Sequence, residues 1–188
     1  PNTDTAERLA DKVRRGREKA HVDFAFFVGA TTGNADTLGR LERLPGCAGV
    51  KIFMGSSTGT LLVAEDDAIE AVLRNGHRRV AVHCEDEKRL IERRSLAAVG
   101  DPKTHPVWRD DVTAIRATER LLALAHRTGR PVHVLHVTTE EEAARLATEK
   151  RVATMEVTPQ HLLLSGPECY ERLGTRAQMN PPIREKRH

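Results

Sequence analysis

Three side chains of this 188-residue sequence stand where metal-dependent chemistry could use them. Lys51 lies inside the apolar run GVKIFM, His83 ends RVAVH, and His136 follows PVHVL. A bare ammonium is costly to bury, so a lysine in such a run often lies at a sheet edge or extends to solvent. Alternatively, a depressed pKa lets the amine add carbon dioxide and become a carbamate. That group is an anionic oxygen ligand able to bridge two metal ions, which imidazole nitrogens also bind.

Either histidine alone would more often be a structural residue with satisfied hydrogen bonds. Alternation along the strands places His83 on the face of Ala81, and His136 on the face of Val134 with His133 on the other. Active groups of parallel α/β folds lie at the C-terminal ends of strands, so both histidines are expected at one mouth. Together with a strand lysine they favour a zinc site.

The C-terminal part of the chain offers one more polar candidate. Asn180 precedes two prolines, which favour extended backbone at the residue before them. It is either a turn residue or an amide that hydrogen-bonds a planar, amide-bearing ligand.

Five short apolar runs alternate with longer amphipathic stretches, which predicts strands and helices in a parallel α/β sheet. The expected strands are His21 to Val28, Gly49 to Met54, Arg79 to Cys84, Pro131 to Val137 and Val152 to Val157. The expected helices are Thr5 to Lys19, Ala35 to Leu44, Asp66 to Leu73, Asp86 to Ala98, Asp110 to Thr128 and Thr139 to Thr148. We expect one domain over residues 1–188. An open, nucleotide-binding sheet is disfavoured, because Gly55 to Thr60 (GSSTGT) is neither GxGxxG nor a P-loop.

The composition argues against nucleic-acid-binding, disulfide-rich and membrane-spanning proteins. Apolar residues make up 39% and charged residues 30%, and the net charge is +3. The charges are interleaved without a basic, aromatic-rich run, so we expect no nucleic-acid partner. Three widely spaced cysteines argue against a disulfide framework. No apolar run reaches the roughly 20 residues of a membrane span, and no signal peptide is visible. We therefore expect a cytoplasmic protein with no membrane partner.

With these motifs in order, the sequence resembles the cyclic amidohydrolases of the amidohydrolase superfamily, and most closely the dihydroorotases. The resemblance runs through nearly the whole chain. Its motifs are Pro1-Asn2-Thr3, GVKIFMGSSTGTLLV, VHCEDE, HPVWR, VLHVTT, EVTPQHL and QMNPPIR. It implies a partial TIM (β/α)8 barrel with about five of the eight βα units.

The resemblance also implies roles for single residues. Lys51 is similar to the carbamylated lysine that bridges two zinc ions, and His83 and His136 to ligands of the second ion. Asn2 is similar to an asparagine that binds the substrate carboxylate, and Asn180 to one that contacts the dihydropyrimidine ring. The implied activity is the reversible hydrolysis of L-dihydroorotate to N-carbamoyl-L-aspartate, a step of de novo pyrimidine biosynthesis.

The sequence also departs from the family. The His-x-His pair and Arg of the first strand, and the Asp and His of the last, are absent. No catalytic acid or base is therefore assigned, and we expect the 188-residue chain to be inactive by itself. Its open sheet edges should be filled by residues outside this sequence or by non-native assembly. The alternatives are a hydantoinase or allantoinase, or a noncatalytic dihydroorotase-like subunit. We expect a homo-oligomer, with aspartate transcarbamoylase as a candidate partner.

Overall fold

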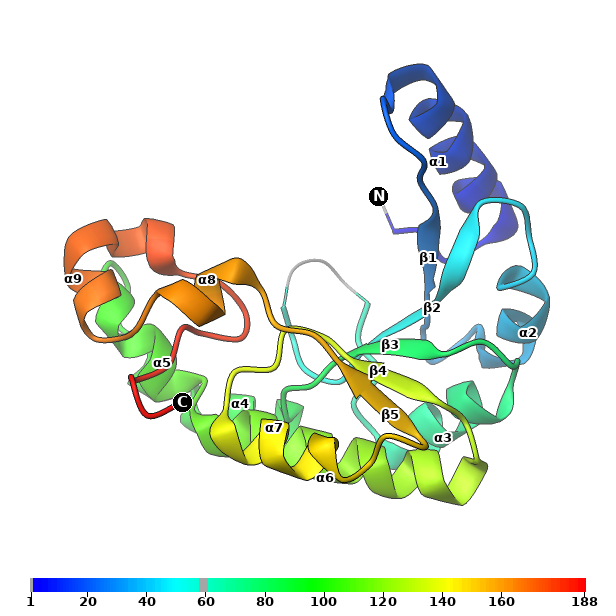
Figure 1. The fold of residues 1–188 in the computed structure, drawn as a ribbon. Coiled ribbons are helices and arrows are strands. Elements are labelled where there is room, and N and C mark those ends of the chain that lie inside the picture. The colour runs from blue at the N-terminus through cyan, green and yellow to red at the C-terminus, as the bar shows by residue number, and fades with distance from the viewer. Residues whose placement is uncertain (1, 58–60) are drawn as a thin grey trace.

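The computed structural model describes residues 2–57 and 61–188 (Figure 1). Pro1 of the Pro-Asn-Thr motif and residues 58–60 of the GSSTGT segment lie outside the described residues. The strands form one parallel sheet in chain order: β1 (Phe26–Gly29), β2 (Cys47–Phe53), β3 (Val80–His83), β4 (Val132–Val134) and β5 (Ala153–Met155). The predicted α/β class with a parallel sheet is confirmed.

Helices connect the strands and extend the chain beyond β5. The α-helices are α1 (Ala6–Lys19), α2 (Leu38–Leu41), α3 (Asp66–Arg74), α4 (Glu87–Arg93), α5 (His105–Trp108), α6 (Asp111–Thr128), α7 (Glu140–Ala147), α8 (Pro159–Leu163) and α9 (Glu168–Leu173). The 3-10 helices are η1 (Ala35–Thr37), η2 (Arg94–Leu96), η3 (Pro102–Thr104) and η4 (Gly174–Ala177). No helix in the described ranges is both long and apolar enough to cross a membrane.

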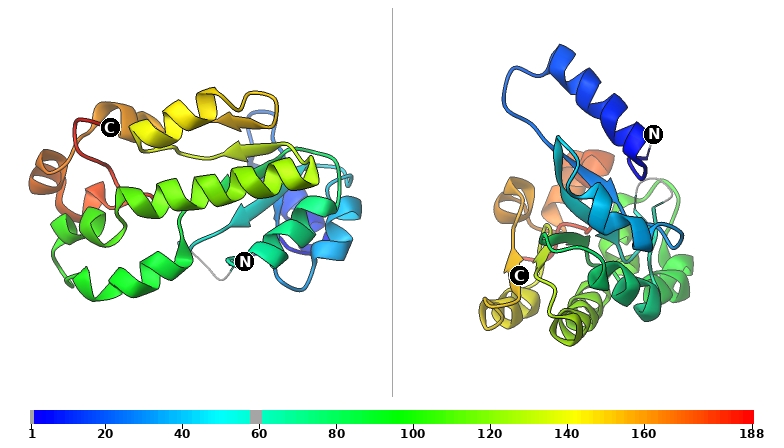
Figure 2. Two further views of the ribbon diagram at one scale, coloured as in Figure 1. Left: turned by 90° about the horizontal axis from the view of Figure 1, so that it is seen from below. Right: turned by 90° about the vertical axis from the view of Figure 1, so that its right-hand side faces the viewer.

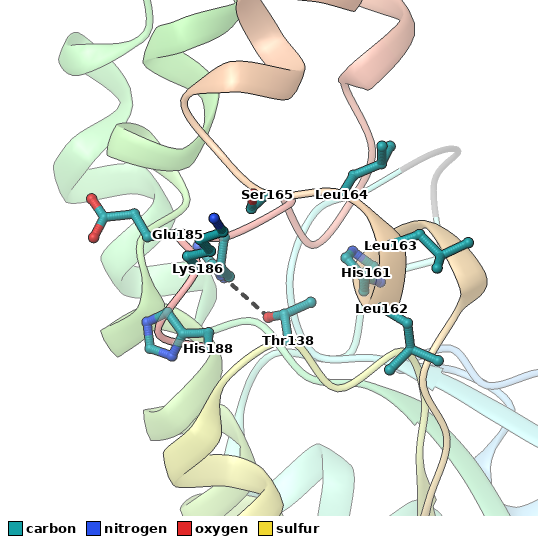
Figure 3. A pocket seen from close by; sticks show the side chains of 10 residues that line it. Thr138, His161, Leu162, Leu163, Leu164, Ser165, Glu185, Lys186 and His188 are labelled. Atoms are coloured by element: carbon teal, nitrogen blue, oxygen red, sulfur yellow. Dashed lines mark hydrogen bonds between the residues drawn. The ribbon is translucent and has the colours of Figure 1, made fainter.

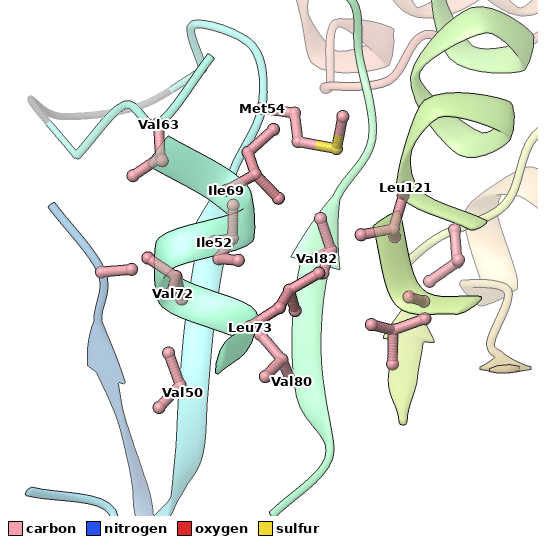
Figure 4. Close-up of a cluster of buried hydrophobic side chains, with 14 of the residues drawn as sticks. Val50, Ile52, Met54, Val63, Ile69, Val72, Leu73, Val80, Val82 and Leu121 are labelled. Atoms are coloured by element: carbon pink, nitrogen blue, oxygen red, sulfur yellow. The ribbon is translucent and has the colours of Figure 1, made fainter. Parts of the chain in front are cut away.

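One face of the sheet is covered by α3, α6 and α7, as the view from below shows (Figure 2). The strands present β-branched side chains to these helices, and the helices return leucine and isoleucine side chains (Figure 4). The central residues of this buried layer are Val50, Ile52, Val80, Val82, Val132, Val134, Ile69, Val72, Leu73 and Leu121. Burial of this apolar layer fixes which residues of each strand face the helices.

The opposite face, which we call the site face, carries the residues between those valines. Lys51, Ala81, His133 and Thr154 lie side by side in register across β2 to β5. Because neighbours in register share a face, Lys51 and His133 point to the same side of the sheet. His133 lies opposite Val132 and Val134, as predicted.

The alternation predicted for His136 is wrong. The fourth strand ends at Val134, short of the predicted end at Val137. His136 follows with a φ of +41°, in the left-handed region. A β-strand register therefore does not extend to this residue, and its side chain does not continue the face of Val134. The turn directs it to the side of His83 instead.

Side-chain caps begin α6 and α7. Asp110 caps α6 through a hydrogen bond from the Thr113 amide, and Thr139 caps α7 through the Glu142 amide. Gly129 ends α6 with a φ of +68°, a conformation that glycine adopts without strain. The helix predicted over Asp86 to Ala98 is shorter and breaks into α4 and η2.

The segment after β5 forms a second, smaller apolar cluster around Cys169, Tyr170, Ala177 and Ile183. The Tyr170 hydroxyl donates to the Ile183 carbonyl at 3.0 Å and joins α9 to the C-terminal segment. The sequence patterns predicted neither α8 nor α9, because both helices are too short to show a period. They lie beyond the C-terminal ends of the strands, beside α5 (Figure 1).

Candidate metal and substrate site

His83 and His136 meet at the C-terminal ends of β3 and β4. His83 Nδ1 lies 3.0 Å from His136 Nε2, and the two rings stand edge to face. Burial lowers the pKa of both imidazoles, that of His136 to about 3, and the nearby Lys51 ammonium lowers both further. Both rings are therefore neutral at pH 7, which is the form that binds metals. The predicted convergence of the two histidines is confirmed.

Lys51 lies mid-strand in β2, two residues before its end. Its ammonium donates to the Ile52 carbonyl at 3.0 Å and lies 4.0 Å from the centre of the Phe53 ring. Burial lowers the pKa of this amine to about 7. At neutral pH a large fraction is thus the free amine, which is the nucleophile that carbamate formation requires.

The distance between the two histidines determines whether they can bind the same metal ion. In the described ranges, no group of three or more His, Cys, Asp or Glu side chains is arranged to hold one. Two nitrogens on one tetrahedral zinc ion stand about 3.3 Å apart, given Zn–N bonds of about 2.0–2.1 Å. The 3.0 Å separation of His83 Nδ1 and His136 Nε2 is close to that value. The spacing of the two histidines is therefore compatible with a single ion bound by both.

Asn180 is held above the same end of the sheet by two side chains from distant segments. Its Oδ1 lies 3.1 Å from His105 Nε2, which also lies 3.0 Å from the Met179 carbonyl. Its Nδ2 donates to Ser57 Oγ at 3.2 Å. Ser57 belongs to the segment that follows β2, so Asn180 contacts the chain just beyond the strand that carries Lys51.

Asn2 lies at the outer strand of the sheet. The neighbouring Thr3 carbonyl accepts from the Gly29 amide at 2.7 Å, and Gly29 is in register with Lys51. Asn2 therefore stands next to the end of β1, two strands away from His83. Of the five predicted residues, Lys51 lies within its strand and the other four lie at or beyond strand ends, with direct contact between the two histidines.

Sequence reasoning assigned no role to a buried ion pair next to His83. Glu85 accepts from Arg109 at 2.5 Å and lies 2.8 Å from His83 Nε2. Burial would raise the pKa of Glu85, but hydrogen bonds from His83 and Arg109 outweigh it and bring the pKa to about 2. The sequence shows where the two residues stand but gives no sign that they are in contact. Glu85 follows His83 at strand spacing, and Arg109 ends the HPVWR motif.

A separate pocket of about 380 Å³ lies between α8 and the C-terminal segment (Figure 3). Its edge carries the hydrogen bond from Arg184 Nε to Thr138 Oγ1, at 3.2 Å. His161 lines it but is engaged with Thr158 Oγ1 and the Pro181 carbonyl. None of the five predicted site residues lines this pocket.

Comparison with known proteins finds relatives among the cyclic amide hydrolases. The chain is 34% identical to a dihydroorotase of Methanosarcina mazei over 197 aligned residues, which cover 98% of this chain. The chain is a homologue of the cyclic amidohydrolases. It spans 42% of the length of that relative. An allantoinase of Deinococcus radiodurans is 32% identical over 96% of the chain, again with 42% of its own length matched. No protein-family profile matches the chain.

Solved cyclic amidohydrolases share the fold. The L-hydantoinase (dihydropyrimidinase) of Arthrobacter aurescens superposes with a TM-score of 0.88 and 23% identity over 99% of this chain and 43% of its own. A dihydropyrimidinase of Brevibacillus agri gives 0.86 and 24% over 97% of this chain and 42% of its own. The predicted partial TIM barrel is confirmed, since the chain matches part of these barrels.

Proposed function

We propose that the chain supplies part of the active site of a metal-dependent cyclic amide hydrolase, and specifically of a dihydroorotase. The reaction is the reversible hydrolysis of L-dihydroorotate to N-carbamoyl-L-aspartate. The observation that carries the proposal is the approach of two neutral imidazoles, His83 and His136, beside a buried lysine whose pKa is about 7. Homology to dihydroorotases supports the choice of reaction.

The histidines and the lysine are proposed as metal ligands, and the two asparagines as substrate-binding residues. His83, His136 and a carbamylated Lys51 would hold zinc, and a complete site would hold two ions. Bound zinc supplies a Lewis acid for the ring carbonyl and an acidified water. Asn180 offers an amide that can both donate to and accept from the planar ring, and Asn2 can donate to a carboxylate. Such contacts orient the ring before attack, which lowers the barrier through proximity.

A second candidate is the hydrolysis of allantoin or a hydantoin. The Deinococcus radiodurans allantoinase, at 32% identity, favours it nearly as strongly as the dihydroorotases favour the first. A dihydroorotase prefers the substrate that bears a carboxylate. Comparing the rates of hydrolysis of L-dihydroorotate, allantoin and a hydantoin therefore distinguishes the two activities.

A noncatalytic subunit is disfavoured because it would have no need of Lys51, His83 and His136. A homo-oligomer, a complex with aspartate transcarbamoylase and a cytoplasmic location stay predictions.

The first test is zinc and carbamate binding by the 188-residue chain. We expect zinc to be retained against a chromophoric chelator, and 13C-bicarbonate to give a carbamate resonance that Lys51→Ala abolishes. His83→Ala and His136→Ala should lose zinc. His133→Ala is the matched control, because this histidine shares the site face but contacts Thr154 and Glu156 instead. A wild-type chain that binds no zinc would refute the proposed site.

The second test concerns turnover. The general base expected from the resemblance is not in this sequence, so the zinc-loaded 188-residue chain should hydrolyse none of the three substrates. A chimera in which residues 1–188 replace the matching segment of the Methanosarcina mazei dihydroorotase should hydrolyse L-dihydroorotate. The same chimera with His136→Ala should not. Turnover by the isolated chain would contradict the prediction of inactivity.

A further inference from the structure

We propose that Glu85 is a positioning residue that fixes the tautomer of His83, with the ring proton on Nε2 and the lone pair on Nδ1, the nitrogen that would bind a metal ion. Arg109 is its necessary partner. This inference rests on the proposed function for its purpose, but the tautomer itself is a property of the metal-free chain.

The geometry determines where the ring proton of His83 lies. His83 and Glu85 are both buried, with side chains 1% and 0% exposed, and Nε2 lies 2.8 Å from Glu85 Oε2. An ionised carboxylate only accepts hydrogen bonds, so the proton of the neutral ring stands on Nε2. Nδ1 then carries a lone pair directed at His136 Nε2, 3.0 Å away. The other tautomer would leave two acceptors, Nε2 and the carboxylate, in unfavourable contact.

Arg109 keeps Glu85 in the form that this arrangement needs. Its Nε lies 3.0 and 3.2 Å from the two carboxylate oxygens, and its Nη2 lies 2.5 Å from Oε2. The same Nη2 donates to the Ser56 carbonyl at 2.5 Å, which ties the guanidinium to the segment after β2. Arg109 thus compensates the charge on both oxygens of Glu85, and Oε2 also faces His83 Nε2. Carboxylates that bind the far nitrogen of a metal-ligating histidine orient the ring and raise its basicity.

A second buried ion pair provides a matched control. The side chains of Glu42 and Arg130 are 1% and 3% exposed, and their closest charged atoms are 2.7 Å apart. In the pair at the site, Glu85 and Arg109 are 0% and 3% exposed, and the corresponding distance is 2.5 Å. Glu42 accepts from the amides of His77 and Arg78, which precede β3. This pair therefore braces the N-terminal ends of the strands, opposite to the site. Substitutions there should disturb folding to a similar degree without touching the histidines.

The experiment compares Glu85→Gln/Arg109→Met with Glu42→Gln/Arg130→Met, each of which removes one charge of either sign. Long-range 15N–1H NMR of the metal-free chain reports which ring nitrogen carries the proton, and His83→Asn assigns the signal. We expect Nε2–H for His83 in the wild-type chain and in the Glu42 pair variant. In the Glu85 pair variant the Nδ1–H form should rise to a substantial share, and zinc affinity should fall by about 10–100-fold.

Two results would overturn the inference. One is an unchanged Nε2–H population in the Glu85 pair variant. The other is a loss of zinc affinity no larger than that of the control pair. Failure of the wild-type chain to bind zinc would count against the proposed function alone, because the tautomer comparison still decides the role of Glu85. If the double variant does not fold, Glu85→Gln with Arg109 intact serves for the same NMR comparison.

Discussion

At the scale of single residues, the burial of Lys51 lowers the stability of the folded chain. Its amine is buried against Phe53 on a central strand, and burial is the main cause of its low pKa. A methionine of similar length would fill the same space without a polar group to desolvate. Functional sites that need a reactive group commonly keep such a residue although it lowers the stability of the fold.

We therefore expect Lys51→Met to stabilise the metal-free chain by about 1–3 kcal/mol, the usual cost of a poorly compensated buried polar group. Urea unfolding followed by circular dichroism measures the change. Lys51→Arg serves as the control, since it keeps the charge and should not stabilise. A Lys51→Met chain less stable than wild type would show that the lysine is favourable where it lies.

The candidate site residues could be named from the sequence, whereas the direction of their side chains could be predicted for only some of them. Lys51 and His83 lie within regular strands, where alternation gives the correct face. His136 lies beyond the end of β4 in a left-handed conformation that no two-residue period anticipates. The Glu85–Arg109 pair depends on a contact between residues 24 positions apart, which a single sequence without known contacts does not reveal.

At the scale of elements, the ends of β2 and β3 approach each other closely at Gly55. A Cβ built on this glycine would lie 2.5 Å from the Glu85 carbonyl oxygen and 3.0 Å from its carbonyl carbon. Since both contacts are backbone atoms, neither can move aside without displacing the segment that holds His83. The glycine thus permits the two strand ends to converge.

Gly55→Ala should accordingly destabilise the chain by about 1–3 kcal/mol, the range for overpacked interiors. It should also weaken zinc binding. Gly33→Ala is the control, because a Cβ there meets nothing within 4 Å and the change should be close to neutral. Thermal unfolding of both variants measures the difference. Equal behaviour of the two would mean that the strand ends have room to adjust.

The start of α6 carries a pH-dependent contribution to stability. Burial tends to raise the pKa of Asp110, but hydrogen bonds from Arg89 and Thr113 bring it down to about 2. Because the folded-state pKa lies below the unfolded value, the unfolded chain binds more protons between pH 2 and 4. The contribution is therefore present above about pH 4 and is lost as the pH falls towards 2.

Asp110→Asn isolates this charge, because asparagine is also a good helix cap. We expect the wild-type chain to exceed the variant by about 1 kcal/mol at pH 6, the size of a well-formed ion pair near the surface. The difference should shrink between pH 4 and 2. Urea titrations at several pH values measure it, and a gap that does not change with pH would exclude the charge as its source.

Element order was predictable, and element ends less so. The five strands and the six long helical stretches correspond to continuous apolar or amphipathic patterns. Each strand is nevertheless shorter than predicted or shifted by a few residues, as with β1, which begins at Phe26 instead of His21. Ladder hydrogen bonds, and not apolar character, determine where a strand stops.

At the scale of the whole molecule, the described sheet has β1 and β5 at its edges. Apolar side chains lie exposed near the β5 edge and along the following helix. These are Met155, Val157, Leu162 and Leu163. Unpaired strand edges with exposed apolar side chains promote association.

We expect the 188-residue chain to self-associate as its concentration rises, and Leu162→Lys/Leu163→Lys to reduce this. The dissociation constant should increase by about tenfold or more, since one buried leucine contributes roughly 1.5–3 kcal/mol. Sedimentation velocity over a concentration series measures it. Val99→Lys, a change at another fully exposed apolar residue, is the control. A wild-type chain that stays monomeric at high concentration would contradict this prediction.

The strict order of the strands has a consequence for biosynthesis. Every strand pairs with the one that precedes it in the chain, from β1 through β5. On the ribosome, each new βα unit therefore emerges after its pairing partner, and the sheet can grow in the direction of translation. The contact between Asn180 and Ser57 spans 123 positions and forms after all five strands have been made. A nascent chain would thus carry its paired histidines well before Asn180 is made and can contact Ser57.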